Sequence, residues 1–288
     1  MFEFITLERG GVDGVDKRVA TLTLNRPEAM NAYHVAMKDE ILTALDEVDA
    51  DDSVAALVVT GAGRAFCAGM DLSNPEAFSR RDETEAERRR DSGGYIALRL
   101  YDLTKPVIGA INGAAVGVGV TMTLPMDIRL ASTKAKFGFV FSRRGIVLET
   151  ASSWFLPRLV GPQQAAEWAY TGRVFDAAEA LRGGLVRSLH EPDELLPAAY
   201  ALAEEIAANT APVSVALNRQ LLLRGLGYDH PMRSHIAESR AMYERGRSKD
   251  MDEGVASFLE KRSAVYPNTV PADLPDVFDD WDPPAFRI

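Results

Sequence analysis

Two short apolar runs, each followed at once by a glycine-rich loop, constrain the fold of this chain more than any other feature. The run Val107–Ile111 is rich in β-branched and small apolar residues, as a buried strand requires, and it leads into a loop with Gly117 and Gly119. Residues 55–60 form a second apolar run, and the loop 61–69 that follows contains three glycines. The later stretch predicts a strand, a tight loop and a helix. The earlier stretch predicts the same first two elements, a strand followed by a glycine-containing loop.

The two loops together predict a site for an oxygen atom that gains negative charge. A helix that begins near Gly117 leaves its first N–H groups without partners inside the helix, and its dipole is positive at that end. Such a loop supplies half of an oxyanion hole. The loop 61–69 is suited to supply the other half, because glycine lets other atoms approach the backbone closely. We therefore expect both loops to converge on one carbonyl oxygen.

The composition bounds the class of protein. A chain of 288 residues with 47% apolar residues can form one large domain or two small ones, with an ample core. It has no run of about 18 apolar residues and no charged-then-apolar leader, so we expect a soluble cytoplasmic protein with no membrane span. The single cysteine, Cys67, excludes an internal disulfide. A net charge of −10 argues against nucleic-acid and membrane-surface binding, although a few local cations can still hold an anionic cofactor.

The N-terminal pattern predicts a ββαβ order. Residues 2–7 and Val19–Leu24 have the apolar character of strands, with a Gly/Asp-rich hairpin loop at 10–16. Apolar residues then fall on one face of a helix over 33–49, before the strand at 55–60. A helix between two strands permits a parallel crossover. The charged segment 75–91 that follows is interpreted as a solvated helix or a flap.

The remaining chain changes from mixed to helical. We expect strands at 128–131, 135–139 and 185–189, and helices at 150–160, 163–170 and 177–182, the last one capped by Asp176. Residues 193–265 read as helices with breaks at Pro212, at 225–227 and at 249–250. Residues 266–288 contain five prolines and five aspartates and cannot form a regular helix. That tail is either extended along its own assembly or disordered.

Three motifs resemble those of the crotonase (enoyl-CoA hydratase/isomerase) superfamily. They are GRAFCAGMDL, KPVIGAINGAAVGVGVTMTLPMDIRLAS and LNRPEAMNA, and the similarity spans roughly residues 15 to 265. The alternative is that they are strand-to-helix turns of an unrelated α/β protein. The resemblance implies an α/β spiral of ββα repeats and a helical C-terminal region that packs in trimers, often as hexamers. On this basis residues 1–195 form the core with the coenzyme A site, 196–265 complete that site and the trimer contacts, and 266–288 are the tail.

The resemblance also assigns the oxyanion hole and weakens one reaction. Carried over to this chain, the two N–H donors belong to Met70 and Val118, and Val118 departs from the usual glycine. Hydratases of this family use two glutamates, and the matching positions here are Thr121 and Phe141. Neither side chain exchanges a proton near neutral pH. A hydratase mechanism of the usual kind is therefore not expected.

One carboxylate stands where the peroxisomal type of Δ3,Δ2-enoyl-CoA isomerase has its base. Glu149 lies in GIVLETASSWFLP, which resembles the pattern GxxPExxSS with Leu148 in place of the proline. A single base suits isomerisation, because one carboxylate can remove a proton from C2 and return it to C4. Burial beside Phe141 and Trp154 would raise its pKa. The alternative is that Glu149 only occupies the first turn of the helix 150–160, where the dipole favours a carboxylate.

The resemblance places the adenine and pantetheine of coenzyme A along residues of the first and third motifs. Its predicted contacts are Arg26, Ala29, Ala65, Phe66, Ala68, Asp71 and Leu72, with Phe258 and Lys261 closing over the nucleotide. Arg26 and Lys261 are candidates to pair with phosphates, although each alone reads as a surface charge. The basic cluster 142–144 either approaches a polar acyl end or is a solvated turn.

No other chemistry is favoured by the sequence. The four histidines lie outside the motifs without metal-ligand spacing, and Cys67 lacks a neighbouring base. We expect no metal and no tightly bound cofactor, with coenzyme A present only as part of a thioester substrate. The sequence thus predicts an enoyl-CoA isomerase. The alternatives are a 2-enoyl-CoA hydratase and a crotonase-fold protein that binds acyl-CoA without turnover.

Overall fold

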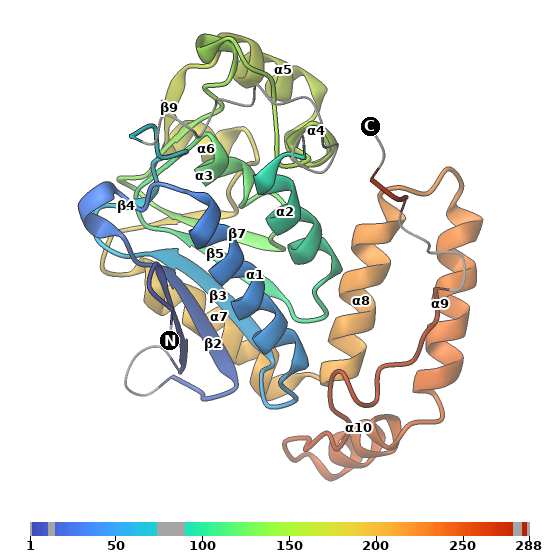
Figure 1. Ribbon diagram of the computed structural model, residues 1–288. Coiled ribbons are helices and arrows are strands. Elements are labelled where there is room, and N and C mark those ends of the chain that lie inside the picture. Colours follow the sequence, from blue (N-terminus) through green and yellow to red (C-terminus); the bar gives the residue numbers. More distant parts are fainter. Residues whose placement is uncertain (1, 11–14, 74–89, 279–283, 287–288) are drawn as a thin grey trace.

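The chain builds two sheets from repeated pairs of strands (Figure 1). The computed structural model describes residues 2–10, 15–73, 90–278 and 284–286. A six-stranded sheet has the order β1 (Ile5–Arg9), β2 (Val19–Leu24), β3 (Ala56–Gly61), β5 (Val107–Ile111), β7 (Ile128–Ser132) and β10 (Ser188–His190). A four-stranded sheet has the order β4 (Ala65–Cys67), β6 (Ala114–Val116), β8 (Lys136–Gly138) and β9 (Val174–Asp176).

Successive repeats lie side by side in both sheets. Strands β3, β5 and β7 pair in parallel in the larger sheet, while β4, β6 and β8, which follow them in the chain, pair in parallel in the smaller one. Strand β1 is antiparallel to β2, as a hairpin requires, and β2 is parallel to β3. The predicted ββαβ start is therefore confirmed. Each repeat adds one strand to each sheet, so the chain advances as a spiral of strand pairs.

The central strands β3 and β5 of the larger sheet are buried on both faces, which explains their continuous apolar runs. Val58 and Ile108 pack against α7 (Leu195–Asn209), whereas the alternate residues Leu57 and Val59 belong to the core on the side of α1 (Val35–Ala50). Helix α2 (Ser92–Asp102) packs beside α1 on that side. Side chains that alternate along a strand therefore feed two separate hydrophobic clusters.

Shorter helices surround the ends of the spiral. Helix α3 (Val118–Thr121) follows β6 directly. Helices α4 (Ser152–Val160) and α5 (Pro162–Thr171) precede β9 in the chain, and α6 (Ala177–Arg182) follows it. The prediction that Asp176 caps α6 is confirmed, because its side chain accepts the N–H of Glu179. Figure 1 shows the helices α8 (Pro212–Gly225), α9 (Pro231–Arg245) and α10 (Lys249–Glu260) standing to one side of the two sheets. None of the helices in the described ranges is long and apolar enough to cross a membrane.

Several element boundaries differ from the sequence-based expectations. The expected strand at 185–189 is the short β10 at Ser188–His190. The break expected at 249–250 lies before Lys249, where Ser248 caps α10 by accepting the N–H of Met251. Strands β4, β6 and β9 were not predicted, because three residues are too few to show an alternating pattern.

The tail packs against its own chain as far as the structure describes it continuously. Residues 266–278 contain no helix, as expected from their prolines. Val270, Val277 and Phe278 are buried in a cluster with α8 and α9, and Lys105 donates to the carbonyl of Val270 over 2.6 Å. The charged segment 75–91 lies outside the described residues apart from its last two positions.

Candidate active site

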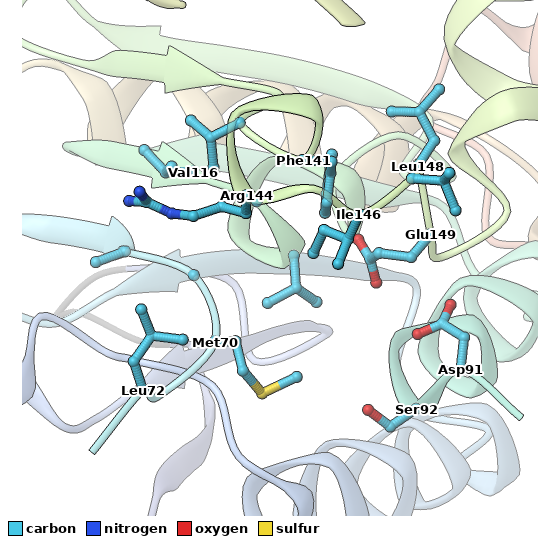
Figure 2. Close-up of a pocket in the computed structure, with 16 residues that line it drawn as sticks. Met70, Leu72, Asp91, Ser92, Val116, Phe141, Arg144, Ile146, Leu148 and Glu149 are labelled. Atoms are coloured by element: carbon cyan, nitrogen blue, oxygen red, sulfur yellow. The ribbon is translucent and has the colours of Figure 1, made fainter. Parts of the chain in front are cut away.

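One cavity of about 720 Å³ gathers the residues that the sequence singled out for chemistry. It lies between the loop after β4, the start of α3, the start of α2 and the segment after β8 (Figure 2). Met70, Val118 and Glu149 all line it, although the first and the last are 79 positions apart in the chain. Its remaining walls are mostly apolar, with Leu72, Val116, Val140, Phe141, Ile146, Val147 and Leu148.

The backbone N–H of Met70 points away from Tyr33, the residue with which Met70 is paired. Tyr33 donates its N–H to Gly69 O over 2.8 Å and accepts the N–H of Asp71 over 2.8 Å. These bonds make an isolated parallel bridge between Tyr33 and Met70. In a parallel bridge the residues on either side of Met70, Gly69 and Asp71, make the hydrogen bonds to Tyr33. The N–H of Met70 itself therefore points away from Tyr33. The N–H of Met70 is thereby available to a group in the cavity.

Val118 presents its N–H for a different reason. It is the first residue of α3, and Gly117 precedes it with a φ of 56°. The first N–H groups of a helix have no acceptor within the helix. Because φ is positive at Gly117, a side chain there would be strained, which explains why this loop carries glycine. Met70 and Val118, from separate loops, therefore line the same cavity. That their N–H groups converge on one carbonyl oxygen stays a prediction.

Two hydroxyl groups hold the carboxyl group of Glu149. Thr121 Oγ1 donates to Oε1 over 2.5 Å, and Thr150 Oγ1 donates to Oε2. Thr121 is fully buried on α3, next to the Val118 donor. The position that the resemblance matched to a hydratase glutamate therefore supplies a hydrogen bond to the remaining carboxylate.

A second carboxyl group, that of Asp91, faces the same end of the cavity (Figure 2). Asp91 caps α2, because its side chain accepts the N–H groups of Gly93 and Gly94 at 3.0 Å each. It also accepts the N–H of Thr150 over 2.5 Å. Sequence reasoning missed this residue. The available signal was an aspartate directly before a helix, the ordinary N-cap pattern.

The environment of Glu149 raises its pKa to about 7. Burial is the largest cause, and the negative charge of Asp91 is the next. The hydroxyls of Thr121 and Thr150 act in the opposite direction because they stabilise the ionised form. A rise through burial agrees with the expectation from the sequence. A carboxyl group with this pKa takes up and releases a proton at neutral pH.

The alternative that Glu149 merely occupies the first turn of a helix is wrong. Helix α4 begins at Ser152, not at Thr150. Thr150 and Ala151 both have positive φ, 59° and 52°, so the chain makes a left-handed step between Glu149 and the helix. A β-branched residue rarely adopts this conformation, and the cost is on the order of 1 to 3 kcal/mol. The step directs the Thr150 side chain and N–H to the two carboxyl groups.

Some of the predicted coenzyme A residues line the cavity and others do not. Ala68 and Leu72 line the cavity, Ala65 and Phe66 are buried in or beside β4, and Ala29 ends the short 3-10 helix Pro27–Ala29. Arg26 is engaged within the chain, because its guanidinium lies 3.2 Å from a carboxylate oxygen of Asp71 and donates to Ala32 O over 2.7 Å. Phe258 and Lys261 lie at α10 and are not among the residues that line the cavity (Figure 1).

The other residues considered from the sequence are placed as follows. Arg144 lines the cavity at the side opposite Glu149 (Figure 2), whereas Arg143 donates to Thr171 O over 2.7 Å. Cys67 is buried, which raises its pKa to about 12 and keeps the thiol protonated. His34 and His230 cap helices α1 and α9. Within the described residues, no group of three metal-binding side chains is present.

The fold and the cavity together define a class of α/β enzyme. Met70 and Val118, from two separate loops, line one cavity together with the buried carboxyl group of Glu149. The enoyl-CoA hydratase/isomerase family model matches residues 14–269. The chain therefore belongs to the enoyl-CoA hydratase/isomerase family within the crotonase superfamily, and its fold is the crotonase fold.

Relatives of this chain are named either as hydratases or as isomerases. The chain is 43% identical over 261 residues to the enoyl-CoA hydratase ACTT3 of Alternaria alternata, which covers 90% of this chain and 86% of the relative. It is 34% identical over 275 residues to 1,2-epoxyphenylacetyl-CoA isomerase of Escherichia coli K12, covering 92% and 99%. A probable enoyl-CoA hydratase/isomerase from Mycobacterium abscessus has a solved structure that matches with a TM-score of 0.81 and 32% identity, covering 92% and 99%.

Proposed function

We propose that this chain is an enoyl-CoA isomerase that moves the double bond of a 3-enoyl-CoA to the 2-position. The observation that carries the proposal is the position of Glu149 in the cavity lined by Met70 and Val118, with Thr121 and Phe141 at the two positions where hydratases have glutamates. One proton-transfer group and one pair of backbone donors suffice for this reaction.

The proposed reaction has two proton transfers through one carboxyl group. The thioester oxygen accepts the N–H groups of Met70 and Val118, and the Glu149 carboxylate takes a proton from C2. The C2 electron pair delocalises over the conjugated dienolate, with negative charge on the thioester oxygen. Protonated Glu149 then returns its proton at C4, which leaves the double bond between C2 and C3. No atom is gained or lost, so the product is an isomer.

The two parts of the site contribute in different ways. Loss of one oxyanion-hole donor costs roughly 3 kcal/mol of barrier in other enzymes, so the backbone donors supply the main stabilisation of the dienolate. The pKa of about 7 at Glu149 gives comparable populations of carboxylate and carboxylic acid at neutral pH. The same group is therefore suited both to remove the proton and to return it.

Hydration of a 2-enoyl-CoA is the second candidate reaction. It is supported by the name of the Alternaria relative, which is 43% identical to this chain. The carboxyl pair of Asp91 and Glu149 at one end of the cavity also offers two groups where hydratases use two glutamates. The hydrogen bonds that Asp91 receives from three N–H groups leave it less suited than Glu149 to transfer protons.

The proposal extends to the substrate and the assembly. The substrate is an acyl-CoA thioester, with no other tightly bound cofactor. Phe258 and Lys261 close over its nucleotide, and Arg26 and Asp71 border its path. The chain forms a homotrimer or a dimer of trimers in the cytoplasm. These statements rest on the family to which the chain belongs.

The test supplies 3-enoyl-CoA and 2-enoyl-CoA separately and follows double-bond migration against addition of water by mass. We expect migration by the wild type and a loss of about 10² to 10⁴ in kcat for Glu149→Gln, with substrate binding retained. Glu194→Gln is the control, because Glu194 is exposed and its side chain makes no capping bond. Hydration that survives Glu149→Gln would contradict the mechanism. Binding without turnover across a panel of acyl-CoA thioesters would show a protein that only binds them.

A further inference from the structure

We propose that Asp91 is a positioning residue for Glu149, and that its fixed negative charge sets how strongly Glu149 holds a proton. The inference rests on the proposed function only in naming Glu149 as the proton-transfer group. It assigns a role to a residue that lies 58 positions earlier in the chain and comes from the start of a different helix.

The structure fixes the Asp91 carboxyl group from three sides. Oδ1 accepts the N–H of Gly93, and Oδ2 accepts the N–H groups of Gly94 and Thr150. Two of these donors belong to the first turn of α2, whose dipole favours negative charge. Backbone donors do not reorient as side chains do. The charge is therefore held in one place relative to the cavity.

Thr150 connects the two carboxyl groups. Its N–H binds Asp91 and its hydroxyl binds Glu149 Oε2. The left-handed conformation of Thr150, with φ of 59°, is what allows one residue to serve both. Such backbone strain persists only where the surroundings over-determine it, and the two carboxyl groups with α2 supply that constraint. The orientation of Glu149 thus depends on Asp91 through a single residue.

Gly93 brings α2 close enough for the charges to interact. A Cβ atom on Gly93 would lie 2.7 Å from Glu149 Oε2 and closer still to the Thr150 hydroxyl. Glycine at position 93 therefore lets the first turn of α2, which Asp91 caps at its N-terminus, pack against Glu149. Figure 2 shows both carboxyl groups at the same end of the cavity, with Ser92 beside them.

Other titratable groups near Glu149 in the described chain do not replace this effect. Burial raises the pKa of the Tyr33 phenol above its ordinary value and that of Cys67 to about 12, so both are neutral at pH 7. Arg144 lines the opposite side of the cavity. Asp91 is the charge that acts on Glu149 at close range, and it raises the pKa of Glu149. It therefore strengthens the base and keeps the acid form available for the return step.

The main test is the pH profile of kcat/KM for Asp91→Asn. Asparagine remains a good helix cap but carries no charge, and its amide can donate to Glu149. The Glu149 pKa then falls, so we expect the acid limb of the profile to move to lower pH by on the order of one unit. The plateau value of kcat falls because a weaker base accepts the proton less readily, while KM changes little. Asp91→Ser keeps a capping side chain and provides the same comparison if the asparagine variant is unstable.

The matched control is Asp176→Asn, which alters the N-cap of α6 in the same way but lies outside the cavity. We expect its profile to coincide with that of the wild type. If Asp91 only stabilises the helix, the Asp91 variants will unfold more easily with an unmoved acid limb, and that result would overturn the proposal.

A readout without turnover separates this inference from the proposed function. The protein is labelled with ¹³C at glutamate side-chain carboxyls, and the Glu149 signal is assigned by its absence in Glu149→Gln. We expect that signal to titrate at lower pH in Asp91→Asn than in the wild type. An unchanged titration overturns the role of Asp91 even if the isomerase is active. A shifted titration supports it even if no enoyl-CoA is turned over.

Discussion

The hydroxyl of Thr121 lies 2.5 Å from Oε1 of Glu149 and donates a hydrogen bond to it. Thr121 stands on α3, one turn after the Val118 donor, at the position that the family resemblance matched to a hydratase glutamate. The site has therefore not merely lost a carboxyl group there. Thr121 binds the carboxyl group of Glu149, and this hydrogen bond links α3, which begins at Val118, to the group that we propose transfers the proton.

Thr121→Val removes this donor with little change in shape. Because the hydroxyl stabilises ionised Glu149, its loss raises the Glu149 pKa further. We expect the acid limb of kcat/KM to move to higher pH by up to about one unit, opposite to the shift expected for Asp91→Asn. Thr123→Val is the control, since Thr123 is also buried but donates to Val120 O over 2.7 Å. Equal profiles for the two valine variants would contradict the assigned hydrogen bond.

Gly93→Ala should damage the site more than the neighbouring Gly94→Ala. The Cβ on residue 93 would meet Glu149 Oε2 at 2.7 Å and Val118 Cγ2 at 3.2 Å, so the carboxyl group must move. A displacement of about 1 Å costs up to roughly 10² in rate. On residue 94 the nearest atom, Asp91 Oδ2, lies 3.2 Å away, and alanine is favoured in helices by up to about 1 kcal/mol.

Steady-state kinetics and thermal unfolding of both variants distinguish the two positions. We expect Gly94→Ala to lose less kcat than Gly93→Ala, because it requires only a small movement of Asp91 Oδ2. If Gly93→Ala keeps wild-type kcat, α2 does not constrain Glu149 as the distances indicate.

The sequence predicted the architecture where the signals were long and local. The run Val107–Ile111 is buried at every position and appears as β5 without a boundary shift. The glycine loops placed Met70 and Val118 at one cavity because parallel strands bring equivalent loops to the same edge of the sheet. The family motifs added Glu149, which also lines this cavity.

The sequence did not predict the second carboxyl group, because its role depends on contacts between distant residues. Asp91 ends a segment that reads only as charged, and its bond to Thr150 spans 59 positions. The positive φ of Thr150 is also unexpected, since threonine rarely adopts it. The expectation of a helix from residue 150 followed from propensity. The hydrogen bonds from Thr150 to the two carboxyl groups outweigh that propensity, and the helix begins only at Ser152.

Val118→Pro tests the backbone donor directly, with Val118→Ala as its matched control. Proline lacks the N–H, and it is tolerated at the first position of a helix, where this N–H has no intrahelical acceptor. We expect kcat to fall by about 10² to 10³ for proline. Alanine keeps the N–H and should retain most of the activity, while accepting bulkier substituents at C2. If circular dichroism shows that both variants are folded and their activities are equal, the N–H of Val118 is not a donor in the oxyanion hole.

Glu149→Gln should change the pH dependence of stability as well as activity. The pKa of Glu149 is raised to about 7 in the folded chain from 4.5 as its ordinary value, so the native state binds this proton more tightly than the unfolded state. Its contribution to stability is therefore complete below about pH 4.5 and is lost as the pH rises through about 7. Glutamine does not titrate. We expect the free energy of unfolding of Glu149→Gln, relative to wild type, to increase between pH 5 and pH 8 by on the order of 1 to 3 kcal/mol. Urea unfolding at both pH values and one protein concentration measures the difference, and Glu194→Gln should show none. A difference that stays constant with pH would mean that Glu149 is not held with a raised pKa, and its carboxylate would then be a weaker base toward the proton at C2.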